Sequence, residues 1–248
     1  MENRKTHRSV LKLKVFAAVV LLLLIWSVIK MGRVYIEDRQ VFEYLVSGGE
    51  KEIPDTFLEE LWEQNGVEAV SAVLDIPVHM ELEEYEMEIS LRAVDTAVFP
   101  IKIESCLSEL ETGSKTVLFI TPQTLDGLTD KNQYEITKSK KEELKERILE
   151  MTAVIYSAAE EMQEPEISAD EKVRGHKPAV YRETGIFAAV LENGESRVYI
   201  PYENGKKFLE SSGQTAEVKT VYIKIRGRSK ADAVKRNLKQ IGFHTEPL

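Results

Sequence analysis

Side chains that could carry catalysis or bind a metal are few and scattered in this 248-residue chain. Beyond the N-terminal segment the histidines are His79, His176 and His244, and the single cysteine is Cys106. Asp75 and His79 share one face of a predicted strand, but their separation along it spans roughly 13 Å, too far to share a proton. We therefore expect surface histidines rather than a metal triad or a catalytic dyad.

A single cysteine excludes an internal disulfide, a cysteine-based zinc site and an iron–sulfur cluster. Cys106 has no signature of a nucleophile paired with histidine, so we interpret it as a small buried hydrophobic residue. The motifs G-x-S-x-G, H-E-x-x-H, G-x-x-x-x-G-K-[ST] and G-x-G-x-x-G are absent from the sequence. We therefore expect no catalytic residue, no cofactor and no metal site.

A run of carboxylates offers the hard oxygen ligands that calcium prefers: Glu81, Glu83, Glu84, Glu86 and Glu88. The run lacks the Asp-Gly spacing of a dedicated calcium loop. Alternation places Glu86 and Glu88 on one face of a strand, so a solvated hairpin face explains the run more simply. Carboxylates that no motif singles out leave an anchored cell-envelope enzyme as the alternative to a noncatalytic protein.

The elements that would position any site begin with an apolar segment near the N-terminus. Val15–Ile29 is free of charge and contains four consecutive leucines. It is shorter than the ~20 residues of a full span, but Lys12, Lys14 and Lys30 can reach the headgroups. We predict a transmembrane signal anchor over residues 15–31. The alternatives are a cleaved signal peptide and a buried helix, although no A-x-A-like cleavage site follows the segment.

Charge predicts the orientation of this anchor. Five basic residues precede it: Arg4, Lys5, Arg8, Lys12 and Lys14. By the positive-inside rule, residues 1–14 form a cytoplasmic tail, and the C-terminal domain lies in the extracellular or periplasmic space. Residues 1–32 balance at +5 while the whole chain carries −9, so the remainder carries −14. Such an acidic domain argues against nucleic acid as a partner.

Patterning predicts several elements after the anchor. A helix-compatible stalk covers residues 32–53, and Thr56 with Glu59 forms the capping box of a short helix. Residues 70–82 and 85–93 alternate as the strands of a hairpin.

The middle of the chain is less regular. Residues 116–120 predict a buried strand before a brief helix through Leu128, and Ser139 with Glu142 predicts the cap of a charged helix. Residues 152–159 are compatible with either a helix or a strand. Residues 163–177 are polar and lack any period, so they predict a surface loop. Asn193-Gly194 suits the tight turn of a hairpin between residues 185–191 and 196–200.

The C-terminal part is the clearest unit. Residues 218–227 alternate as a strand, and Ser229 with Asp232 caps a helix that Gly242 ends. The element order predicts an α+β fold, with a mixed, largely antiparallel, two-lobed extracytoplasmic domain over residues 54–248.

These last residues carry a family resemblance. VYIKIRG followed by KADAVKRNLKQIGF resembles the closing strand and helix of the extracytoplasmic domains of MacB-type or FtsX-type ABC transporter permeases. The strand GVEAVSAVL and the pairs TVLFITPQTLDGL and SRVYIPYENGKKFL are similar to that family in order. The resemblance implies a porter-like part, residues 54–95 plus 214–248, with an inserted lobe over residues 96–213.

The chain departs from that family in its membrane segments. The permeases carry four spans, whereas uncharged stretches late in this chain, such as residues 152–159, fall far short of ~20. We therefore predict a membrane-anchored, noncatalytic extracytoplasmic binding or interaction protein, and not an enzyme. The resemblance implies an accessory or degenerate component of a MacB/FtsX-like system, with the lipid bilayer and transporter subunits as its partners.

Overall fold

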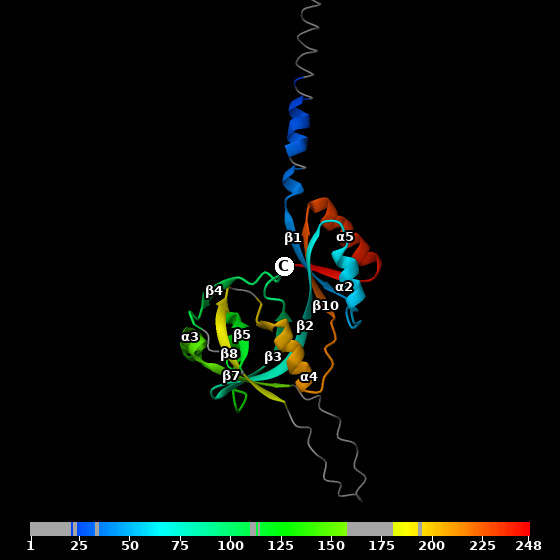
Figure 1. Ribbon diagram of the computed structural model, residues 1–248. Coiled ribbons are helices and arrows are strands. Elements are labelled where there is room, and N and C mark those ends of the chain that lie inside the picture. The colour runs from blue at the N-terminus through cyan, green and yellow to red at the C-terminus, as the bar shows by residue number, and fades with distance from the viewer. Residues whose placement is uncertain are drawn as a thin grey trace, which may run out of the picture.

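One long strand joins the two lobes of the protein. The computed structural model describes residues 21, 24–32, 35–109, 113, 115–157, 181–192 and 195–248. In this part of the chain, β2 (Val67–Leu82) pairs through its first half with β10 (Thr220–Arg226). Its second half pairs with β3 (Tyr85–Val94) and β7 (Thr152–Ser157) (Figure 1). The predicted α+β fold with a mixed sheet is confirmed.

The first lobe, here the sheet lobe, is an antiparallel sheet with two helices on one face. Its strand order is β11 (His244–Pro247), β1 (Val41–Ser47), β10 and the first half of β2. The helices are α2 (Asp55–Trp62) and α5 (Arg228–Gln240). The order β-α-β, β-α-β with this sheet arrangement is ferredoxin-like. A short hairpin would normally join β2 to β10, and here the whole second lobe is inserted between them.

Both faces of this sheet are covered. On the helix side, Phe57 and Phe243 stack with ring centroids 4.6 Å apart above the buried Val221 and Ile223. On the other side, the segment after β3 crosses the sheet, and Phe99 lies against Tyr222 with ring centroids 5.2 Å apart.

β1 corrects the prediction of a helical stalk. The described helical residues before it are 21, 24–32 and 35–37, whereas residues 41–47 form a strand between β10 and β11. Tyr44, Leu45 and Val46 are all buried. A strand buried on both faces lacks the two-residue alternation that identifies a half-exposed strand. The sequence pattern therefore did not indicate β1.

The second lobe, here the barrel lobe, is a closed ring of six strands. Starting from β2, the neighbours are β3, β9 (Val198–Pro201), β5 (Thr116–Ile120), β8 (Arg182–Leu191), β7 and β2 again. The β3–β9 and β5–β8 pairs are parallel, and the others antiparallel. β4 (Ile103–Cys106) pairs with β8 and β6 (Thr129–Asp130) with β3, as additions to the ring.

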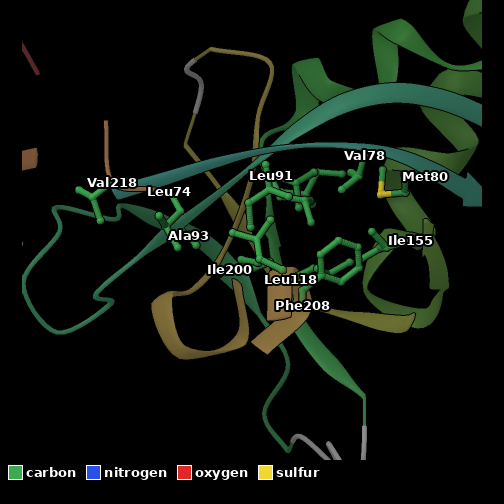
Figure 2. Packing of buried hydrophobic residues seen from close by; sticks show 14 of the residues in the cluster. Leu74, Val78, Met80, Leu91, Ala93, Leu118, Ile155, Ile200, Phe208 and Val218 are labelled. Atoms are coloured by element: carbon green, nitrogen blue, oxygen red, sulfur yellow. The ribbon is translucent and has the colours of Figure 1, made fainter. Parts of the chain in front are cut away.

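Apolar side chains fill this barrel. Met80, Leu91 and Leu118 are fully buried, and Figure 2 shows them in one cluster with residues from the neighbouring strands. Helix α4 (Tyr202–Ser211) packs against β2, β3 and β9 through its buried residues, Gly205, Phe208 and Leu209. The interior is therefore a packed core, not a ligand channel.

β8 and β9 correct a second prediction. They do not pair as a hairpin, because β5 lies between them, parallel to β8 and antiparallel to β9. Residues 193–194, at the predicted turn, lie outside the described residues, as does the loop predicted over residues 163–177. A turn dipeptide between two apolar runs carries no information about a third strand that inserts between them.

Other predicted elements are confirmed with shifted starts. β2 and β3 form the predicted hairpin, β7 shows that residues 152–157 are a strand, and two 3-10 turns are η1 (Pro122–Gly127) and η2 (Ile148–Glu150). The predicted caps are wrong, because Thr56, Ser139 and Ser229 lie inside the first helical turns. For example, α3 (Lys138–Arg147) begins after Thr137, whose side chain accepts a hydrogen bond from the Lys140 amide.

Candidate interaction surface

The histidine and cysteine candidates are not brought together in the described part of the chain. The His79 Nδ1 atom lies 3.9 Å from the Glu88 carboxylate on an exposed face, while Asp75 binds other partners. His244 lies in β11, and His176 lies outside the described residues. Within the described ranges, no group of three or more His, Cys, Asp or Glu side chains is arranged to hold a metal ion.

Cys106 is exposed, which corrects the expectation of a buried residue. All four residues of β4 are exposed, because this strand is an outer addition to the barrel. Two carboxylates of the β2–β3 hairpin also bind different partners and do not form a common site. Glu83 pairs with Arg147 at 3.5 Å, and Glu84 accepts a hydrogen bond from the Tyr85 hydroxyl at 2.8 Å.

A charged network fixes the junction of the two lobes. Arg92 of β3 is only 6% exposed, and its Nε and Nη2 atoms donate to the two carboxylate oxygens of Asp75 at 2.8 and 3.0 Å. Arg197 donates to the same carboxylate at 3.4 Å and to Glu195 at 2.6 Å. These residues are far apart in sequence, so no local pattern predicted the network.

The pKa directions agree with a structural role for this network. Burial disfavours the charge on Arg92, but the hydrogen bonds and charge of Asp75 outweigh it and raise the pKa of the guanidinium. The hydrogen bond and charge of Arg197 lower the pKa of Glu195. Pairing therefore favours the charged forms of Arg92 and Glu195, as expected of a clamp between β2, β3 and the segment leading to β9.

Apolar side chains are exposed on the helical residues that precede β1. Leu24, Trp26, Val28 and Met31 are 60–71% exposed, and Figure 1 shows this part of the chain standing clear of both lobes. The Lys30 ammonium lies 5.2 Å from the centre of the Trp26 ring. No helix in the described part of the chain is both long and apolar enough to span a membrane.

The predicted anchor can be compared with the structure only in part. Of Val15–Ile29, residues 15–20 and 22–23 lie outside the described residues. The basic residues predicted to set the topology lie outside them too: Arg4, Lys5, Arg8, Lys12 and Lys14. The span and its orientation remain predictions.

A groove follows the free edge of β2 between the lobes, and we call it the β2 groove. Over residues 67–73, β2 pairs with β10 on one side, and no other described strand pairs with that stretch. Two adjoining hollows of about 410 and 440 Å³ share Val70 and Ala72. The first is walled by Leu58 and Trp62 of α2, and the second by residues 94–96 and 201–203.

Every charged residue that lines the β2 groove is acidic. These residues are Glu59 and Glu63 of α2, Asp95 after β3, and Glu203 of α4. Among the described residues, none of the four makes an ion pair. Burial, followed by the charges of Asp55 and Glu203, raises the pKa of Tyr202. The groove thus combines an apolar floor with a negative rim.

Sequence patterning did not reveal this groove. Val70 and Ala72 were predicted as ordinary positions of a hairpin strand. Their place at a free edge depends on where β3 turns away from β2, which no local pattern specifies.

Comparison with known proteins shows similarity at the level of structure only. No family model and no curated protein matches the chain. It is similar to the extracellular domain of the ABC-type transporter YknZ from Gram-positive bacteria, at 12% identity and a TM-score of 0.46, covering 84% of this chain and 100% of that one. It is also similar to the periplasmic region of MacB from Actinobacillus actinomycetemcomitans, at 10% identity and a TM-score of 0.47, covering 86% and 91%.

A third similar structure is a domain of a permease protein from Porphyromonas gingivalis, at 10% identity and a TM-score of 0.39, covering 86% of this chain and 90% of that one. The first two are extracytoplasmic domains of the kind to which the sequence shows resemblance, and at identities of 10–12% the similarity concerns the fold alone. They assign no role to any residue of this chain.

Proposed function

We propose that this chain is a membrane-anchored, noncatalytic extracytoplasmic interaction protein. The observation that carries the proposal is the exposure of Leu24, Trp26, Val28 and Met31 on helical residues that stand clear of both lobes (Figure 1). Apolar side chains in such an arrangement are stabilised by a lipid bilayer. Residues 38–40 lead directly from this helical segment into β1, so the sheet lobe would sit next to the membrane surface.

The proposed domain order adds the orientation that the basic residues before the anchor favour. Residues 1–14 form the cytoplasmic tail, residues 15–31 the anchor, and the two lobes lie outside. The sheet lobe is the porter-like part, now with β1 included, and the barrel lobe is the inserted part.

Interaction is favoured over catalysis by the pairing of charged groups. Asp75, Arg92, Glu195 and Arg197 satisfy one another in the junction network. The carboxylates of the β2 groove, which make no ion pair with a described residue, border an apolar floor, and no described histidine, cysteine or serine other than Ser71 lines the groove. Apolar floors with charged rims are typical of protein interfaces.

The partner we propose is an ABC transporter system of the MacB or FtsX type. This step rests on the resemblance of residues 218–243 and the preceding strand-proline-helix pairs to that family. We propose an accessory or degenerate component, because residues 15–31 are the one span that the apolar patterning of this sequence predicts.

Crosslinking in the native membrane tests this proposal. The full chain is purified through a C-terminal tag, and the crosslinked proteins are identified by mass spectrometry. We expect enrichment of an ABC ATPase and a multispanning permease. The matched control is Leu24→Lys with Val28→Lys, which makes the exposed helical residues polar and should lose both the membrane fraction and the partner. Absence of every transporter component from the wild-type sample would refute the assignment.

A further inference from the structure

We propose that the β2 groove binds an extended, basic segment of a partner protein, which adds as a strand to the free edge of β2. The inference rests on the proposed function as an interaction protein, and it specifies the mode of binding and the chemistry of the segment. Strand addition uses backbone hydrogen bonds for affinity and side-chain pockets for selectivity.

The free edge results from the path of β3. Ala93 pairs with Leu74, but at Asp95 the chain turns away, with the Val98 and Phe99 amides donating to the Asp95 carbonyl. Residues 67–73 are therefore left without a neighbour where β3 would have continued. Alternate N–H and C=O groups of such a strand point outward over a length of roughly 23 Å.

Beyond a register shift near its start, opposite Lys224 and Ile225, this edge lacks three features that commonly protect a strand from pairing. Proline, lysine and short length are the common devices. The opposite edge of the sheet uses two of them, since β11 has four residues and ends at Pro247. Residues 67–73 contain no proline, and their single charged residue, Glu68, is paired with Arg226.

Side chains on both faces of the edge offer apolar contacts to an incoming strand. Val70 and Ala72 face the helix side, beside Trp62, which is 56% exposed. Ala69 and Val73 face the other side, in the cluster that contains Phe99. Alternate residues of an added strand would meet these two surfaces, so the segment should carry apolar side chains at every second position.

Charge selects among possible occupants. The rim carboxylates Glu59, Glu63, Asp95 and Glu203 favour lysine or arginine on the incoming segment. A second copy of this chain pairing through the same edge would bring two identical acidic rims together, which is unfavourable. The structure therefore favours a basic segment of a different protein.

A synthetic peptide tests the proposal on the full chain in detergent. The probe is an eight-residue, end-capped peptide of alternating valine and lysine, measured by fluorescence anisotropy at 0.15 M salt, where long-range attraction is screened. We expect saturable binding. Glu59→Lys with Glu63→Lys should weaken it about tenfold, because two attractive carboxylates are replaced by charges of the peptide's own sign. The matched control, Glu104→Lys with Glu192→Lys, changes the net charge equally beside β4 and should alter affinity less than twofold.

Four results would overturn the proposal. A peptide with N-methyl groups on alternate amides that binds as tightly as the parent shows that the edge hydrogen bonds are unused. An alternating valine and glutamate peptide of equal affinity removes the charge argument. An equal loss in the control variant shows nonspecific attraction. A dimer of the chain that the peptide disrupts assigns the groove to a second copy.

This inference and the proposed function fail separately. If the crosslinked transporter components are recovered equally with Glu59→Lys and Glu63→Lys, the groove assignment is refuted and the function stands. If the peptide binds as expected but no transporter component is recovered, the partner assignment is refuted and the groove stands.

Discussion

The packing of α4 on the barrel makes a sharp prediction about Gly205. An alanine Cβ at this position would lie 2.3 Å from the Ala93 Cβ. It would also lie 3.3 Å from the Ile76 Cδ1 atom and 3.3 Å from the Ile200 Cδ1 atom. The first distance is about 1.5 Å inside the optimum for two carbon atoms. Ala93 belongs to a strand paired on both sides, so its Cβ cannot rotate away.

The expected cost of Gly205→Ala is a balance of two effects. Overpacking costs about 1–3 kcal/mol, and the higher helix propensity of alanine returns about 1 kcal/mol. Because the clash involves two backbone-fixed atoms, we expect a net loss of about 1–2 kcal/mol and a Tm lower by roughly 3–6 °C. Thermal unfolding of the full chain in detergent, followed by circular dichroism, measures this.

Two further variants separate the clash from other effects. Gly127→Ala is the matched control, because its Cβ meets no atom within 4 Å, and it should be neutral or slightly stabilising. In an Ala93→Gly background the clash is removed, so Gly205→Ala should no longer destabilise the protein. An equal cost in both backgrounds, or equal effects of Gly205→Ala and Gly127→Ala, would refute this account of how α4 packs.

Three other perturbations test the junction, the sheet lobe and the outer strand. Arg92→Met removes the bidentate partner of Asp75 and should cost about 2 kcal/mol in urea unfolding, less than for a fully buried pair because Asp75 is 34% exposed. No measurable loss would show that the network does not hold the junction. Tyr222→Phe removes a 2.9 Å hydrogen bond to Glu43 and should cost about 1 kcal/mol at pH 7.

Burial and this hydrogen bond raise the pKa of Tyr222, so folding favours its protonated form. Above pH ~10 the wild type should therefore lose stability more steeply than the variant, by up to about 1.4 kcal/mol per pH unit. Parallel pH profiles would contradict this. Cys106→Ser should change stability by less than about 0.5 kcal/mol, because Cys106 is exposed, and a larger loss in the same unfolding assay would show that β4 packs more tightly.

The alternation of apolar and polar residues predicted those parts of the fold in which one face of an element is exposed to solvent. The β2–β3 hairpin was identified because apolar Met80 and Leu82 alternate with polar His79 and Glu83. In the structure the first two are buried and the last two are exposed. β1 was missed for the opposite reason, since both of its faces are covered. Each of three helix starts was displaced by two residues, because the residues predicted as caps, Thr56, Ser139 and Ser229, lie within the first turns.

The local sequence pattern could not predict which strands distant in the sequence pair with one another. Ring closure depends on β5 lying between β8 and β9, and neither the parallel β5–β8 pair nor the β3–β9 pair has a local signal. The candidate site depends on the same long-range order. Glu59, Val70 and Glu203 lie in three different elements and meet only because the barrel lobe is inserted between β2 and β10.

Labelling of Cys106 in whole cells tests most directly the central claim, that the two lobes are displayed outside an anchoring membrane. Cys106 is the chain's single cysteine and is exposed, so a membrane-impermeant maleimide reports on its location without any substitution, and Cys106→Ser provides the blank. The account predicts full labelling of membrane-bound protein in spheroplasts or intact wall-bearing cells, before lysis. Labelling that occurs only after the membrane is permeabilised would place the lobes on the cytoplasmic side and contradict it.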